Sequence, residues 1–225
     1  MRSLLFVLSV LTLLFVPSSA RRVHSRAAPR VRAGAMGLLS NVFGSSMVFQ
    51  MGAPISLWGA APPGATVQLR MGAANASALA DARGLWRAEL PAVATPSSGH
   101  VIFVSSDAGA NATLTDVSVG TVLLCGGQSN LSGATTPLTY AFNGTESAAE
   151  AAAMPWVRLF AVGELATQGL LPPQAQLGFE PRQPWAPASV ATASAFSAVC
   201  WMTAKEVARA LGAAHPLGLI ESAWS

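Results

Sequence analysis

The stretch Val122-Leu123-Leu124-Cys125-Gly126-Gly127-Gln128-Ser129-Asn130 decides the fold class of this chain. It contains the end of an apolar run over residues 119–125, which predicts a strand covered on both faces of a parallel sheet. The glycines that follow permit a tight turn, and a serine there would expose its hydroxyl in the crevice where ligands of open α/β sheets bind. Ser129 is therefore a candidate nucleophile. The neighbours that would support the turn and an oxyanion are Gly127, Gln128 and Asn130.

Two interpretations of this turn follow from its residues. If a helix starts just after Ser129, its N-terminal amides would stabilise a developing oxyanion. The spacing is not the Gly-x-Ser-x-Gly elbow of α/β-hydrolases, because Asn130-Leu131 stands at the second glycine position. A polar turn without a catalytic role therefore remains the alternative interpretation.

The chain after this turn carries further strand and helix signals. Buried strands are expected at residues 157–162 and 217–220, and Ser147-Ala148-Ala149-Glu150 fits a capping box that opens a short helix. Five prolines between residues 163 and 195 predict a long irregular loop. A later helix that ends at Gly212 is expected to bury one face, made of Phe196, Val199, Cys200, Val207 and Leu211. The order of these elements indicates an α/β domain with a parallel sheet.

The chain before the turn shows short strands between turn signals. Residues 67–71 alternate between apolar and polar side chains, which is the period of a half-buried strand. A turn is expected at residues 81–84, a further strand after it, and a buried strand at residues 101–104. Strands at this spacing predict a small all-β sandwich.

Composition and charge exclude several classes of protein. The chain has 225 residues, of which 10% are charged and 52% hydrophobic, so it is not a disordered polymer. Six of its 13 basic residues lie before residue 36, and the remainder of the chain has seven basic and ten acidic residues. A basic surface for nucleic acid is therefore excluded as the main function, and no nucleic-acid partner is expected.

The N-terminus predicts a secretory signal. Arg2 precedes an apolar run over residues 4–16, and small residues at 17–20 suit signal peptidase. The run is too short to span a bilayer, although an uncleaved anchor remains the alternative. The expected segments are a signal peptide at 1–20, a basic flexible leader at 21–35, a β-sandwich-like domain at 36–116 and an incomplete α/β domain at 117–225. No membrane span is expected in the mature chain, and the expected location is the secretory pathway, with the protein secreted or lysosomal.

Sequons and cysteines bear on the same compartment. The candidate glycosylation sites are Asn75, Asn111 and Asn143. A fourth sequon begins at Asn130, which adjoins the serine turn and is expected to be too enclosed for modification. Cys125 and Cys200 could pair in an oxidising compartment, but both lie in apolar surroundings, and two buried thiols are an equal alternative.

The stretch at 122–130 resembles the nucleophile block of the sialate O-acetylesterase family, which belongs to the SGNH/GDSL hydrolases. Three upstream blocks are similar, in order, to that family's N-terminal β-domain: residues 46–50, residues 57–64 and residues 81–86. Three downstream blocks continue the resemblance: residues 157–160, residues 196–200 and residues 218–224. Together the blocks cover about residues 38–225, and their common order is more specific than any one block.

The resemblance implies a fold and a mechanism. The fold would be an all-β sandwich-like domain followed by a truncated SGNH-type α/β/α domain. Ser129 would attack an O-acetyl ester, its backbone amide would contribute to the oxyanion hole, and a histidine oriented by an aspartate would act as base. The substrate would be O-acetylated sialic acid, free or on glycans, with no metal or organic cofactor.

The resemblance lacks a counterpart for the family's C-terminal Asp-x-x-His block. His24, His100 and His215 are each better explained as structural or solvated residues, so this chain is not expected to complete the triad by itself. Glu221 is expected to be a surface or strand-end carboxylate. The alternatives are an acetylesterase for other polysaccharides and a non-catalytic glycan-binding fragment that uses the β-sandwich. The oligomeric state is not predicted.

Overall fold

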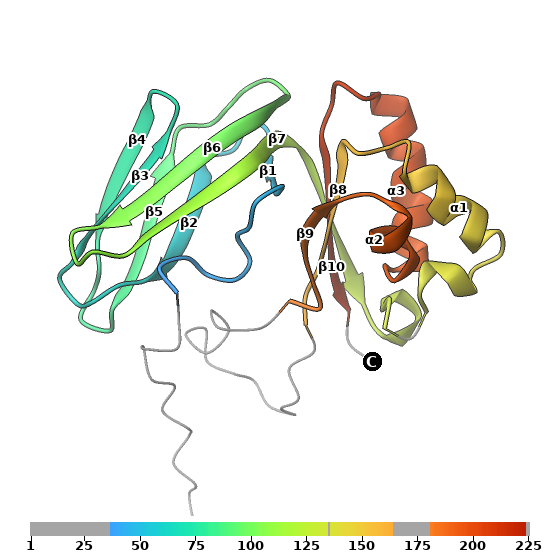
Figure 1. The fold of residues 1–225 in the computed structure, drawn as a ribbon, viewed down its shortest axis with the longest axis horizontal. Coiled ribbons are helices and arrows are strands. Elements are labelled where there is room, and N and C mark those ends of the chain that lie inside the picture. The colour runs from blue at the N-terminus through green and yellow to red at the C-terminus, as the bar shows by residue number, and fades with distance from the viewer. Residues whose placement is uncertain (1–36, 135, 164–180, 224–225) are drawn as a thin grey trace, which may run out of the picture. The chain divides into compact units, whose positions relative to one another are not determined.

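The computed structural model describes residues 37–134, 136–163 and 181–223, all within the compact unit Val31–Ser225 (Figure 1). The strands are β1 Val48–Gln50, β2 Ile55–Ala60, β3 Thr66–Met71, β4 Ala74–Leu79, β5 Leu85–Leu90, β6 Ser97–Ser106, β7 Asn111–Gly127, β8 Val157–Ala161, β9 Gln183–Pro187 and β10 Leu217–Ala223. The helices are α1 Gly144–Ala151, α2 Val190–Ser194 and α3 Ala198–Leu211, with short 3-10 helices η2 Ser129–Leu131 and η3 Leu138–Tyr140.

One large mixed sheet organises the described residues. Its strand order is β4-β3-β6-β7-β10-β8-β9, and β1 also pairs with β7. Pairing is antiparallel from β4 to β7, and parallel between β7 and β10 and between β10 and β8. Strands β2 and β5 form a separate antiparallel pair. The mixed α/β class predicted from the sequence is therefore confirmed.

The N-terminal strands form two layers around one core. In β3, Val67, Leu69 and Met71 are buried while Gln68 and Arg70 are exposed, as the alternation predicts. Apolar residues of β2 and β5 share a single hydrophobic cluster with residues of β3, β6 and β7. The expected turn at residues 81–84 is present, because the Asp81 carboxylate accepts from the backbone amides at 83 and 85.

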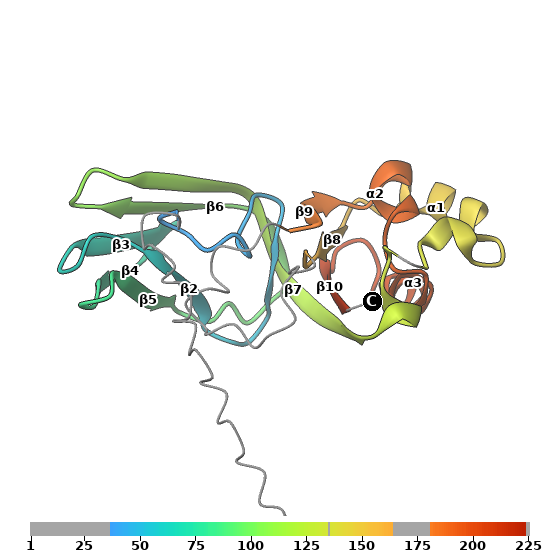
Figure 2. The ribbon, with the colours of Figure 1, turned by 90° about the horizontal axis from the view of Figure 1, so that it is seen from below.

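Strand β7 runs through both halves of the large sheet (Figure 2). Its first half pairs with β6, and its residues Thr121 to Gly127 pair with β10. The boundary expected between residues 116 and 117 falls inside this strand, at Asp116, which has a φ of 54°. The serine turn is thus the direct continuation of a strand anchored in the β-layers.

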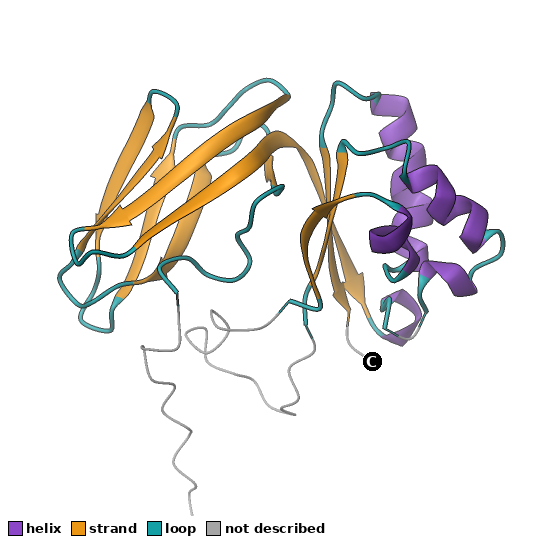
Figure 3. Cartoon of the chain, in the orientation of Figure 1, coloured by secondary structure: helices purple, strands orange, loops and turns teal. Residues whose placement is uncertain are grey.

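The expectation that β7 is covered on both faces is wrong for its second half. Leu123 and Cys125 pack against the helical core, but Leu124 is 69% exposed. The described helices lie on one face of β8 and β10 (Figure 3). The other face carries Phe160, which stacks on Trp185 of β9 at 5.3 Å between ring centroids. The described residues therefore lack the second helical layer of an α/β/α sandwich.

Three local predictions fail because tertiary contacts decide the outcome. Helix α1 begins at Gly144 with Asn143 as N-cap, so Ser147 lies inside the helix and is no cap; its hydroxyl accepts from Trp201 Nε1 at 3.1 Å. In α3 the buried face is Cys200, Trp201, Ala204 and Ala208, while Val199 and Leu211 are exposed. Strand β6 is half-buried rather than buried, with Phe103 43% exposed.

The proline-rich segment is only partly irregular. Pro184 and Pro187 lie in β9, which is the last strand of the sheet, where a missing amide donor is tolerated. Pro172 and Pro173 lie outside the described residues, as do the expected signal peptide and leader. Strands β8 and β10 appear where residues 157–162 and 217–220 predicted them.

An ion pair fixes β7 to β8. The Arg158 guanidinium donates to Asp116 at 2.6 Å, and Ser46 Oγ donates to the same carboxylate at 2.9 Å. Arg158 is buried, whereas the Asp116 side chain is about half exposed. Partial burial raises the pKa of Asp116, but the hydrogen bonds from Arg158 and Ser46 and the Arg158 charge outweigh it, so the pKa lies below its ordinary value.

Asp116→Asn should lower the free energy of unfolding at pH 7 by about 1–2 kcal/mol, because it leaves the buried Arg158 without its counter-charge. A lowered pKa in the folded state means that the carboxylate stabilises the fold above the ordinary aspartate pKa and loses this effect as the pH falls below it. Denaturant unfolding at pH 7 and below pH 3 measures the difference. The two proteins should converge at the lower pH, whereas Ser46→Ala, which keeps the charge, should differ less at pH 7.

Candidate active site

The Ser129 turn forms one wall of an open surface pocket. Gly127 ends β7, and η2 starts two residues later, so residues 126–130 are exposed at the carboxyl end of the strand. The pocket has a volume of about 410 Å³ and is lined by Gly127, Gln128, Ser129, Asn130, Leu131 and Val199. Val199 comes from the first turn of α3 and forms the second wall. Ser129 and the three residues predicted to support it therefore line one pocket.

Main-chain hydrogen bonds hold the turn. The Leu131 amide donates to the Gln128 carbonyl at 2.8 Å, and the Ser132 amide donates to the Ser129 carbonyl at 3.2 Å. Thr136 Oγ1 lies 3.0–3.2 Å from three carbonyl oxygens of the same turn, at Ser129, Asn130 and Ser132. The hydroxyl of Thr136 thus stabilises the turn, a role that no local sequence pattern indicated.

The element after Ser129 is a single 3-10 turn of three residues. A helix macrodipole of useful size needs several aligned peptide units, so the expected support from a helix N-terminus is absent at η2. Any oxyanion stabilisation by the described turn would come from individual amides, such as that of Ser129.

A disulfide joins the two walls of the pocket. Cys125 of β7 is bonded to Cys200 of α3, so the alternative of two free thiols is wrong. Cys125 lies two residues before Gly127, and Cys200 follows the pocket residue Val199. The cross-link therefore ties the serine-bearing strand to the helix that faces it.

Glu221 is buried, with 2% of its surface exposed, and the expectation of a surface carboxylate is wrong. Its Oε1 accepts from the Gly133 amide at 2.8 Å, and its Oε2 accepts from the Ser197 amide at 3.0 Å. Arg182 Nη2 donates to Oε2 at 2.7 Å. The signal that could have revealed this burial is the alternation in β10, which places Glu221 on the same face as Leu217 and Leu219.

Neither described histidine reaches Ser129. His215 Nε2 lies 2.9 Å from Thr121 Oγ1, at the start of the parallel half of β7. A strand rises roughly 3.3 Å per residue, which puts Thr121 roughly 20 Å from Gly127. His100 pairs with Val117, which is farther still along β7. His24 lies outside the described residues.

The sequons differ in their surroundings. Asn75, Asn111 and Asn143 are all exposed, in β4, at the start of β7 and before α1. Asn130 is exposed as well, contrary to the expected enclosure, although Ser132 of the same sequon is buried. The positions are accessible, and their modification stays a prediction.

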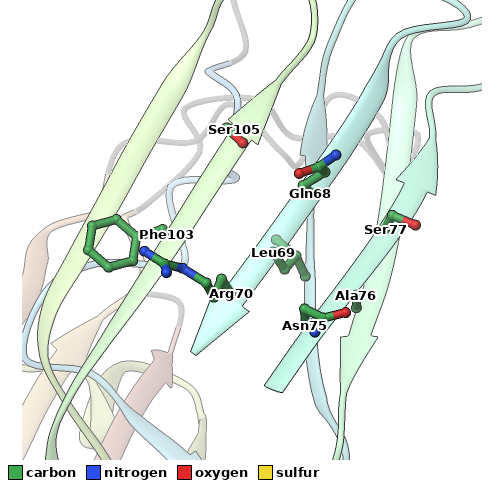
Figure 4. A pocket seen from close by; sticks show the side chains of 8 residues that line it. All are labelled: Gln68, Leu69, Arg70, Asn75, Ala76, Ser77, Phe103 and Ser105. Atoms are coloured by element: carbon green, nitrogen blue, oxygen red, sulfur yellow. The ribbon is translucent and has the colours of Figure 1, made fainter. Parts of the chain in front are cut away.

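A larger hollow of about 510 Å³ lies on the β-layers, away from Ser129 (Figure 4). Its outward side chains come from neighbouring strands, and Arg70 lies over the Phe103 ring with its guanidinium carbon 4.9 Å from the centroid. These two residues face each other in the β3–β6 register, so their contact is an ordinary cross-strand pair. An adjoining hollow contains His100, which lies 2.8 Å from Ser97 Oγ and hydrogen-bonds to no acid in the described structure.

Comparisons with known proteins identify a similar solved structure. No protein-family model and no curated protein matches the sequence. The structure is similar to that of XAC1771, a carbohydrate acetylesterase from Xanthomonas citri, with 33% sequence identity and a TM-score of 0.71. The match covers 83% of this chain and 40% of that chain, so this chain spans less than half of the matched structure.

None of the described helices is long and apolar enough to cross a membrane.

The serine pocket lies at the end of β7 in the large sheet, and XAC1771, a solved structure to which this chain is similar, is a carbohydrate acetylesterase. The described chain therefore has a partial fold that resembles part of a carbohydrate acetylesterase.

Proposed function

We propose that this chain carries the nucleophile of a carbohydrate O-acetylesterase most like sialate O-acetylesterase. The observation that carries the proposal is the exposed Ser129, which follows a parallel strand directly and lines an open pocket. The similarity to a carbohydrate acetylesterase supports the class of reaction. Acetylated glycans would be the substrates, with the acetyl groups of sialic acids as the first candidates.

In the proposed reaction, Ser129 Oγ attacks the acetyl carbonyl carbon while its proton passes to a histidine. The tetrahedral intermediate expels the sugar oxygen, which takes up that proton, and leaves an acetyl-enzyme. Water then attacks the acetyl group, which releases acetate and restores the serine. Because His100 and His215 lie too far away, the histidine and its aspartate would come from polypeptide outside the described residues. No step requires a metal or an organic cofactor.

The proposed compartment is the secretory pathway. The expected signal peptide agrees with the disulfide, because disulfides persist in oxidising compartments. Exposed sequons at Asn75, Asn111 and Asn143 are compatible with N-glycosylation. The protein would be secreted or lysosomal.

Two alternative functions can be tested by experiment. The first is an acetylesterase for other polysaccharides, which would share the serine pocket. The second is a non-catalytic glycan-binding fragment. Trp86, Trp185 and Trp201 are buried and Trp58 and Trp156 are half-buried, so the outward face around Phe103 and Arg70 is the better candidate surface for such a fragment.

Acetate release should separate these functions. The protein, in a version that also contains the catalytic histidine and aspartate, is incubated with O-acetylated sialic acid, acetylated xylan and p-nitrophenyl acetate, and acetate is quantified. We expect release from O-acetylated sialic acid at a rate at least about tenfold above that from xylan, which is the discrimination expected of an enzyme whose contacts fit one sugar. Equal rates would favour the polysaccharide esterase. Glycan binding by a folded chain that releases no acetate would favour the binding fragment.

A further inference from the structure

We propose that Glu221 is a positioning residue that sets the distance between the two walls of the Ser129 pocket. The inference rests on the proposed esterase function for its catalytic consequence, but not for its structural one. Glu221 does not line the pocket. It would act through the two backbone amides that it binds.

The two carboxylate oxygens of Glu221 bind different walls. Oε1 accepts from the Gly133 amide, four residues after Ser129 on the same turn. Oε2 accepts from the Ser197 amide, two residues before the pocket residue Val199. Ser197 is also the N-cap of α3, and its side chain accepts from the Cys200 amide. The carboxylate therefore links the serine turn to the start of α3, beside the backbone hydrogen bonds from Ala198 N to Thr136 O and from Leu138 N to Phe196 O.

Arg182 completes the cluster and neutralises its charge. Its Nη2 donates to Glu221 Oε2, and its Nη1 donates to the Ala195 carbonyl at 2.8 Å. The Ala195 carbonyl belongs to the segment between α2 and α3, so Arg182 holds that segment from the other side. The packing around Gly133 is tight, because a Cβ added there would lie 2.6 Å from the Ala195 oxygen and 2.8 Å from Arg182 Nη2.

Burial makes this arrangement sensitive to the chemistry of residue 221. A buried ionised carboxylate persists only when it is paired and hydrogen-bonded, and Glu221 has both. Glutamine has nearly the same shape but only one acceptor oxygen. In Glu221→Gln the oxygen should stay with the two donors Ser197 and Arg182, so the side-chain NH₂ would face the Gly133 amide, donor against donor.

Amide hydrogen exchange, resolved by residue with NMR, tests the structural part. In Glu221→Gln we expect exchange at Gly133 to speed up about tenfold or more, while Ser197 changes less. The double variant Arg182→Met/Glu221→Leu removes both charges but leaves the Gly133 and Ser197 amides without their acceptor, so its thermal stability should fall although no unpaired charge is buried. Exchange at both Gly133 and Ser197 should increase. Glu150→Gln is the matched control, because Glu150 pairs with Lys205 and Arg209 at a half-exposed site distant in sequence from the turn.

Kinetics test the catalytic part in versions of these proteins that also contain the catalytic histidine and aspartate. With p-nitrophenyl acetate, kcat should fall about tenfold to a hundredfold in Glu221→Gln and in the double variant, with little change in KM. If the cluster contributed only stability, the folded double variant would have the kcat of the wild type. Restored kcat would therefore overturn the proposal, as would unchanged exchange at Gly133 in Glu221→Gln. If the wild-type chain hydrolyses no acetyl ester while exchange changes as expected, the proposed function fails and the role of Glu221 in placing the two walls stands.

Discussion

In a version of the protein that also contains the catalytic histidine and aspartate, Ser129→Ala lowers acetyl-ester hydrolysis by about a thousandfold or more and leaves the melting temperature within about 2 °C of the wild type. The loss is large because removing the nucleophile of a serine hydrolase removes covalent catalysis altogether. The fold is spared because residue 129 is exposed and the turn is held by main-chain groups and Thr136. Initial rates with p-nitrophenyl acetate and thermal unfolding followed by circular dichroism measure the two effects.

The matched control for this variant is Ser97→Ala. Ser97 hydrogen-bonds to His100, which lies in the β-layers and hydrogen-bonds to no acid among the described residues. We expect Ser97→Ala to keep wild-type activity. Loss of activity in Ser97→Ala together with retention in Ser129→Ala would place catalysis at the hollow that contains His100 and would refute Ser129 as the nucleophile.

The elements that the sequence predicted correctly are those whose pattern is decided within the element. Strand β3 alternates because one face meets the core, and β8 is buried throughout, with four apolar residues and Arg158, which pairs with Asp116. The glycine pair after an apolar strand predicted an exposed turn at Ser129, which the structure shows, while the catalytic role of Ser129 stays a prediction. These signals need no knowledge of which element packs against which.

The errors concern residues whose neighbours come from far along the chain. The apolar run predicts that Leu124 is buried, but Leu124 is exposed because no described helix covers that face of the strand. Ser147 reads as a cap, but Trp201 and Lys205 bind its hydroxyl from α3. Glu221 reads as a surface charge, and its partner Arg182 lies 39 positions earlier in an expected loop. Local propensity cannot anticipate such pairings, and functional sites depend on them.

Removing the disulfide should produce the largest change in stability. In Cys125→Ala/Cys200→Ala we expect the free energy of unfolding to fall by about 2–5 kcal/mol, since a cross-link between residues this far apart restricts the unfolded chain strongly. The cysteines are 75 positions apart, and Cys200 is buried. Urea unfolding of the variant and of the oxidised wild type, followed by tryptophan fluorescence, gives the difference.

The reduced wild type separates the cross-link from the packing of the side chains. Wild type treated with a thiol reductant keeps both sulfur atoms in place but loses the covalent bond, so it should resemble the double alanine variant in midpoint. If reduction leaves the midpoint unchanged, the bond contributes nothing and the prediction is wrong. The position of the two pocket walls should change as well, because Cys125 is two residues from Gly127 and Cys200 is next to Val199 in the sequence. A reduced protein that remains folded should therefore show a raised KM, because only non-covalent contacts, among them the Glu221 hydrogen bonds and the backbone bonds of Thr136 and Leu138, still join the serine turn to the start of α3.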